Sequence, residues 1–151
     1  MDIFFRPYDK RVFYQLPIVP ESVPEISMSA KNEEFEGVNG NYNMLGNAGL
    51  QTFGIDCWLP EYPNKYTQPW CKVQINPYLI INLWAQAMST KKPLKCIIVR
   101  GANKNNISPI LLDWWISVES LTHSVMQNLD ISYKVSFKRY ELIGNETNLL
   151  Q

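Results

Sequence analysis

Histidine, cysteine and glycine are scarce in this sequence. Its 151 residues include one histidine, three cysteines and seven glycines. Structural zinc sites need four nitrogen or sulfur ligands at short, regular spacings, and Cys57, Cys71 and Cys96 follow no such spacing. We therefore predict no metal, no cofactor and three reduced thiols from a reducing compartment. A disulfide between two of the three cysteines is the alternative.

An excess of charge is also missing, as are long apolar runs. Fourteen basic and fourteen acidic residues cancel, whereas a nucleic-acid groove needs a basic surface, so no sequence-specific nucleic-acid partner is predicted. No apolar run approaches the length of a membrane-spanning helix, which predicts no membrane partner. The N-terminal residues lack the basic segment and apolar run of a secretory signal.

The stretch from Pro77 to Lys92 predicts the one long helix of the chain. Asn76 is a good N-cap, and Pro77 suits the first helical position because its missing N–H costs nothing there. Pro93 ends the helix. Apolar residues at helical spacing predict the face that packs on a sheet: Leu79, Ile80, Leu83, Trp84, Ala87 and Met88.

The remainder predicts strands and loops. Short strands are expected over 11–16 and 25–29, a polar loop over 31–35, and tight turns at 38–41 and 46–49. Longer strands are expected over 50–59, 94–100 and 129–142, and one or two strands over 107–121. A long aromatic loop is expected at 60–74 and a second loop at 122–128. A polar turn is expected at 101–106. The sequence predicts one domain over residues 1–143, followed by a polar tail over 144–151.

The order of several short motifs resembles a known family. The motifs are Leu16-Pro17 with Pro20 and Pro24, Gly46-Asn47-Ala48-Gly49-Leu50, Trp58-Leu59-Pro60, the proline-led helix with Trp84, Lys92-Pro93-Leu94, and Ile131-Ser132-Tyr133 through Tyr140-Glu141-Leu142. This succession, from about Val12 to Leu142, resembles the N-terminal domain of the XkdP-like baseplate proteins of contractile phage tails and phage-like particles.

The resemblance implies a fold and a role. The fold would be mainly β (α+β), a tail-tube-like antiparallel β-sandwich or partial barrel with one long helix packed on it. The role would be that of a virion structural protein, a tail-tube initiator of a contractile injection system, assembled in the bacterial host cytoplasm. Copies of such proteins, usually six, form a ring that joins the tail tube protein to the hub and spike protein, and the tape-measure protein is a further candidate partner.

Two departures limit what is carried over from the family. Many members continue into a LysM peptidoglycan-binding module, which we do not expect in this chain, so cell-wall binding is not carried over. A basic residue is common before Gly49-Leu50 in the family, whereas Ala48 stands here. Any contact made by that basic residue is therefore not expected.

Two other functional classes compete with the structural role. A hydrolase triad could be drawn from His123 with nearby Ser and Glu119, but the glycine-rich turn of a nucleophile elbow is missing. A cell-wall glycan hydrolase would need two carboxyls about 5–9.5 Å apart. The candidates are Asp56, Asp113, Glu119 and Asp130. A carbohydrate-binding module of the tail tip would use exposed aromatics instead. We predict that the chain is not an enzyme.

Aromatic side chains are the stronger signal of an assembly protein. Trp84 lies on the predicted core face of the helix, whereas the adjacent residues Trp114 and Trp115 would point to opposite faces of a strand. Large aromatics left exposed mark partner surfaces. The predicted subunit-interface residues are Tyr62, Tyr66, Trp70, Trp114 and Trp115.

The last predicted strand alternates cleanly between apolar and polar residues. Ile131, Tyr133, Val135 and Phe137 would face the core. The opposite face carries Ser132, Lys134, Ser136 and Lys138. An ordinary solvated face would look the same, but the resemblance implies that these four residues line the lumen of the tube.

Overall fold

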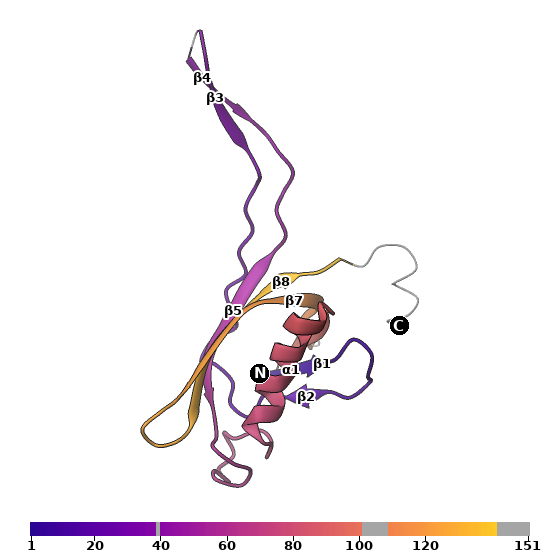
Figure 1. The fold of residues 1–151 in the computed structure, drawn as a ribbon, viewed down its shortest axis with the longest axis vertical. Helices are drawn as coiled ribbons and strands as arrows, with labels where there is room; N and C mark the ends of the chain where they lie inside the picture. Colours follow the sequence, from indigo (N-terminus) through magenta and orange to yellow (C-terminus); the bar gives the residue numbers. More distant parts are fainter. Residues whose placement is uncertain (39, 101–108, 142–151) are drawn as a thin grey trace.

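A curled antiparallel sheet with one helix in its concave face forms the body of the protein, and a narrow arm projects from it (Figure 1). The structure is a computed structural model that describes residues 1–38, 40–100 and 109–141. In chain order the elements are β1 (Asp2–Arg6), β2 (Tyr14–Gln15), β3 (Glu33–Gly37), β4 (Gly40–Met44), β5 (Thr52–Leu59), α1 (Pro77–Thr90), β6 (Leu94–Val99), β7 (Ile110–Val125) and β8 (Ile131–Arg139).

The main sheet has six strands in the order β2-β1-β6-β7-β8-β5, and every neighbouring pair is antiparallel. Because the sheet curls around α1, the molecule has the form of a half-barrel with the helix inside (Figure 1). The predicted fold class, mainly β with one long helix, is confirmed.

The helix begins and ends as the sequence predicts. Asn76 is the N-cap, and its Oδ1 accepts a hydrogen bond from the backbone N–H of Tyr78 at 3.0 Å. Lys91 takes the left-handed conformation at the C-cap, and Pro93 follows. The buried face of the helix differs from the predicted one. Ile81 is buried although it was not predicted to be, and Leu79 and Met88 are exposed although both were predicted to pack on the sheet. The sheet covers the helix from one side only, so the outer part of the apolar stripe meets solvent.

Trp84 is the centre of the core. Its side chain is fully buried, and its ring contacts those of Phe5, Tyr133 and Phe137 from strands β1 and β8. β8 presents Ile131, Tyr133, Val135 and Phe137 to this core, as its alternating sequence predicts. The predicted burial of Trp84 is confirmed.

The structure corrects several predictions of strands and loops in the body. The predicted loop at 122–128 is largely strand, since β7 continues to Val125 and pairs with β8 as far as that residue. In the N-terminal region the predicted strand 11–16 shrinks to β2, and strand 25–29 shrinks to a single bridge between Ser27 and Thr52. The predicted turn at 101–106 and tail at 144–151 lie outside the described residues. No helix in the described residues is long and apolar enough to cross a membrane.

The largest correction concerns residues 27–51, which form the arm. The predicted polar loop at 31–35 lies mostly in β3, which pairs with β4 in a hairpin from Glu33–Met44 to Gly37–Gly40. The predicted turn at 46–49 is instead the stem, where Lys31 N donates to Asn47 O at 2.8 Å. A Cβ at Gly46 would lie only 1.7 Å from the Lys31 carbonyl oxygen. Glycine is required there because the two stem segments approach so closely.

Candidate assembly surfaces

The arm is an amphipathic ribbon, and its described residues project away from the body beyond the base (Figure 1). All five residues of β3 and all five of β4 are exposed. Phe35 lies opposite Tyr42, and their rings stack at 5.5 Å between centroids. The neighbouring pair Glu33 and Met44 shares that face because alternate residues of a strand lie on the same side.

The other face of the arm is polar. It carries Glu34 and Glu36 opposite Asn43 and Asn41. One face of the arm hairpin, residues 33–44, is therefore aromatic and apolar, and the other is acidic and polar. An isolated two-stranded hairpin is at best marginally stable in water. Burial of the aromatic face against a partner surface would therefore stabilise the arm.

The strand that carries the arm, β5, is also an open edge of the sheet. Arg139 N, at the end of β8, donates a hydrogen bond to Gln51 O at 2.8 Å. Gln51 and Arg139 therefore form a hydrogen-bonded pair of the antiparallel ladder. Since bonding alternates along an antiparallel strand, the backbone groups of Gly54 and Asp56 point away from β8. Within the described residues, the backbone groups of Gly54 and Asp56 make no hydrogen bond to another strand. Such an edge can accept a strand from another chain.

An aromatic cluster lies at the end of β5 opposite the arm. Trp58 of β5 contacts Tyr66 and Trp70 of the loop 60–76, with ring centroids 5.2 to 6.0 Å apart in the three pairs. The ring planes meet at 46° to 81°. The rings therefore pack against one another rather than forming a flat platform. Trp70 and Tyr62 remain 47% and 52% exposed, whereas Tyr66 is half-buried.

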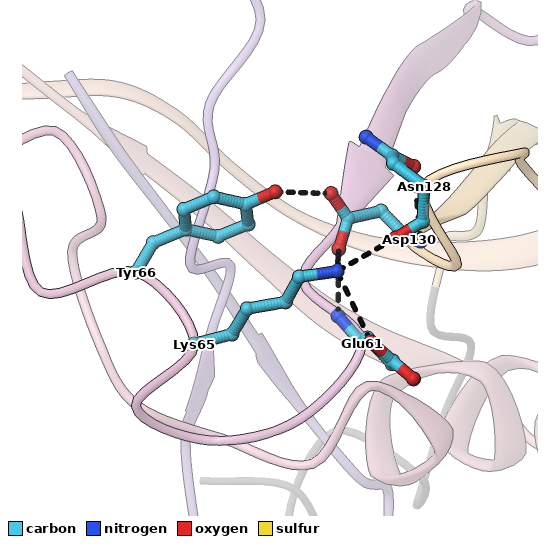
Figure 2. Close-up of polar contacts among 5 residues, drawn as sticks. All are labelled: Glu61, Lys65, Tyr66, Asn128 and Asp130. Atoms are coloured by element: carbon cyan, nitrogen blue, oxygen red, sulfur yellow. Dashed lines mark hydrogen bonds and ion pairs between the residues drawn. The ribbon is translucent and has the colours of Figure 1, made fainter.

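A buried carboxylate fixes this loop to the body (Figure 2). Asp130 lies before β8 and is 1% exposed. It accepts hydrogen bonds from the Tyr66 hydroxyl at 2.6 Å and from the backbone N–H of Glu61 at 3.0 Å, and its Oδ1 lies 2.9 Å from Lys65 Nζ. Lys65 also reaches the Glu61 carboxylate at 3.1 Å and the Asn128 carbonyl at 2.8 Å.

The same contacts determine the protonation states. Burial raises the pKa of Asp130, but hydrogen bonds from Tyr66, Lys65 and the Glu61 N–H outweigh it, so the net pKa is lowered. The hydrogen bond to Asp130 is also the main cause that raises the pKa of Lys65 and that of Tyr66. Asp130 is thus held as an anion and Lys65 as a cation. This set of charged contacts, the clasp, holds the aromatic loop to the body. Sequence spacing did not indicate it, because the loop residues Glu61 and Tyr66 lie 69 and 64 positions from Asp130.

Trp114 and Trp115 lie on opposite faces of β7, as predicted. Trp114 packs against Phe53 on the core side at 6.0 Å between centroids. Trp115 lies on the outer face, where the Arg6 guanidinium and the Lys95 ammonium approach its ring at 5.0 and 5.2 Å. Both tryptophans are half-buried. Neither is as exposed in the single chain as Tyr62 and Trp70.

The outer face of β8 joins that of β7 in a polar strip. Ser132 and Ser136 pair through their hydroxyls with Ser124 and Ser120 of β7, and Lys134 is exposed between them. Lys138 follows on the same face and is half-buried. The β7 half of this strip was missed by the sequence analysis. Its alternating Ser120, Thr122 and Ser124 were the available signal.

The candidate hydrolase triad is not formed, although His123, Ser124 and Asp56 line one hollow of about 180 Å³. Ser120 pairs with Ser136 and Glu119 accepts from Ser117, so neither makes a hydrogen bond to the exposed His123. Asp113 pairs with Lys95 at 2.8 Å. In the part of the chain that the structure describes, no group of three His, Cys, Asp or Glu side chains could hold a metal ion. Cys57, Cys71 and Cys96 are free thiols.

Comparisons with known proteins give structural neighbours only. No protein-family model matches the sequence, and no curated protein matches it. Among solved structures, a chain in the tail of an empty GTA particle with C6 symmetry is 11% identical, covering 95% of this chain and 93% of that one, with a TM-score of 0.48. A chain in the six-fold symmetrised baseplate of the anti-feeding prophage is 7% identical, covering 93% and 88%, with a TM-score of 0.46.

Proposed function

We propose that this chain is a non-enzymatic structural subunit of the baseplate of a contractile phage tail or phage-like particle. Copies of it, six in our proposal, form a ring that connects the tail tube to the hub and spike. The observation that carries the proposal is the arm, because it is a long ribbon whose exposed aromatic face is not covered by any described part of its own chain (Figure 1). Apolar surface of this kind is typical of a partner interface.

The distribution of surfaces along β5 supports the same role. The arm enters this strand at Thr52, and the aromatic loop leaves it at Leu59, so the two lie at opposite ends of the molecule (Figure 1). The free edge of β5 lies between them. A subunit with different surfaces at its two ends and an unpaired edge at its side suits head-to-tail contacts, which close into a ring when the rotation between copies allows it.

In this arrangement Tyr62, Tyr66 and Trp70 belong to a subunit interface, as do Trp114 and Trp115. Ser132, Lys134, Ser136 and Lys138 face the lumen. Support for the lumen comes from the strip across β7 and β8, in which the serine hydroxyls pair with one another and Lys134 is exposed between them. A wall of this kind offers few free groups to which a passing chain could adhere.

The geometry at Asp130 favours the structural role over a glycan hydrolase. A general acid of a glycosidase needs a raised pKa, whereas Asp130 has a lowered one and shares Lys65 with Glu61. The tilted rings around Trp58 likewise support a packed loop rather than a sugar-stacking platform.

Complementation in the producing cell tests the proposed function. A strain without the chain should make no complete tails by electron microscopy, and the wild-type chain should restore them. A chain with Phe35→Ser and Tyr42→Ser should fold normally but fail to restore tails, whereas the matched control Asn41→Ser and Asn43→Ser should succeed. Normal tails in the strain that lacks the chain would contradict the proposal.

A further inference from the structure

A hollow lies between α1 and the segment that joins β1 to β2. Its volume is about 310 Å³, and its lining includes Asp9, Lys10, Leu79, Leu83, Ala87 and Lys92. The size is at the lower end of the range of roughly 300–1,000 Å³ for sites that receive a compact group. A side of α1 left uncovered by the sheet therefore forms one wall of a recess.

The lining of the hollow is mixed, since it includes Asp9, Asn82, Gln86 and Thr90 beside apolar and basic residues. Its apolar part, called the floor here, is Leu79, Leu83 and Ala87 at helical spacing along α1, and Leu79 is 49% exposed. Its basic part, called the rim, is Lys10 and Lys92. Within the described residues Lys10 has no acidic partner, and Lys92 reaches Asp9 only at 4.0 Å with both side chains more than half exposed. An exposed pair of this kind is weak, so the rim is open to a stronger acidic partner.

The arm hairpin has the complementary character. Residues 33–44 contain three glutamates and no basic residue, whereas the rest of the chain has 14 basic and 11 acidic residues. The aromatic face of the hairpin combines Phe35 and Tyr42 with the carboxylate of Glu33. An apolar surface beside a negative charge thus matches an apolar floor beside two lysines.

We propose that this hollow receives the arm hairpin of a second copy of the chain. The Phe35–Tyr42 face lies on Leu79 and Leu83, and Glu33 meets the lysines of the rim. The arm of the same chain cannot occupy the site, because it extends away from the body (Figure 1). This inference rests on the proposed function in one respect, namely that copies of the chain assemble. It adds which surface of the neighbour receives the arm.

Two variants that each lose one side of the contact test the proposal. The acceptor variant carries Phe35→Ser and Tyr42→Ser, which removes the arm face but keeps the hollow. The donor variant carries Leu79→Glu and Lys10→Glu, which blocks the hollow but keeps the arm. All four positions are exposed, and circular dichroism should show that both variants keep the wild-type fold. Sedimentation velocity should find each variant monomeric alone and a 1:1 heterodimer after mixing.

Matched controls lie on the opposite faces of the same two elements. Replacing Asn41 and Asn43 by serine alters the polar face of the arm, and Met88→Glu alters the exposed side of α1 that does not line the hollow. A donor chain with the two serine changes should bind the acceptor, and an acceptor chain with Met88→Glu should bind the donor, each as tightly as the unmodified pair. Removal of Phe35 and Tyr42 should instead weaken binding at least about tenfold, as expected for aromatic residues at the centre of an interface.

Disulfide trapping gives a second readout. A chain with Tyr42→Cys mixed with a chain with Leu79→Cys should form an intermolecular disulfide, and the pair Asn43→Cys with Met88→Cys should not. If wild-type chains assemble but the mixture stays monomeric and no selective disulfide forms, the inference is wrong and the proposed function stands. This inference is also overturned if the wild type and the mixture both stay monomeric at the highest soluble concentration and no disulfide forms. In that case tail complementation still tests the proposed function separately.

Discussion

The ring of Trp84 lies 5.0 Å from the ring of Tyr133, and both side chains are buried, at 0% and 2% exposed. Neither polar atom of the pair is satisfied within the described residues, since Trp84 Nε1 and the Tyr133 hydroxyl have no hydrogen-bond partner there. The contact joins α1 to the middle of β8. It therefore holds the helix in the curl of the sheet through dispersion and apolar burial rather than through hydrogen bonds.

Removal of the Trp84 ring should be among the most damaging single changes to the fold. Trp84→Ala is expected to lower the free energy of unfolding by about 3–5 kcal/mol, because a large cavity would open between α1 and the sheet. Trp70→Ala is the control, since that ring is half exposed. Urea unfolding of the two variants measures the difference, and a Trp84 variant with wild-type stability would contradict the assigned core.

The Tyr133 hydroxyl should be dispensable. Burial raises the pKa of Tyr133 well above its usual range, so the hydroxyl stays neutral. It also has no hydrogen-bond partner within the described residues. An unsatisfied buried polar group costs roughly 1–3 kcal/mol. Tyr133→Phe should therefore leave the melting temperature unchanged or raise it. A clear loss of stability would show that the hydroxyl makes a hydrogen bond in solution.

The clasp at Asp130 should make the aromatic loop sensitive to acid. The folded-state pKa of Asp130 is lowered, so its contribution is complete above the unfolded pKa of about 3.9 and is lost as pH falls through the folded value. At neutral pH Asp130→Asn should destabilise the chain by about 1.5–3 kcal/mol through weakened charged hydrogen bonds. Thermal melts at several pH values should show the variant and the wild type converging below the folded pKa.

Asp56→Asn is the matched control for the clasp, because Asp56 is exposed on β5 and has no such set of partners. It should melt close to the wild type at every pH. Equal behaviour of the two variants would show that the Asp130 contacts do not hold the loop.

The three cysteines should differ in reactivity. Cys57 is half-buried, whereas Cys71 and Cys96 are buried, and burial raises the pKa of Cys57 and, more strongly, that of Cys96. Alkylation of the native protein should therefore label Cys57 first, and denaturation should release three thiols in mass spectrometry. A pair of cysteines resistant to alkylation after denaturation, but labelled after reduction, would reveal a disulfide.

The body of the fold could be predicted from the sequence wherever local signals and burial agree. Asn76, Pro77 and Pro93 bounded α1, and the alternation of Ile131 to Phe137 identified β8. Both elements pack on one core, so their apolar pattern survives in the structure.

The arm and the clasp could not be predicted in the same way. The tight turn predicted at 38–41 does lie between β3 and β4. Glu33 to Gly37 nevertheless resembled a polar loop, because Phe35 is its one large apolar residue and three of its five residues are glutamates. The clasp depends on a contact between Asp130 and a loop more than 60 positions away. Pairings at that separation are set by the curl of the sheet and leave no trace in spacing.

A cryo-EM reconstruction of tails from cells that produce this chain would test the central claim most directly. Exposure of Phe35, Tyr42, Tyr62 and Trp70 would be calculated for one chain alone and again with its neighbours. We predict that copies of the chain form a ring between tube and hub and that these four residues, all exposed in the single chain, are covered by neighbours. Equal exposure in both calculations, or a tail without the chain, would contradict the account.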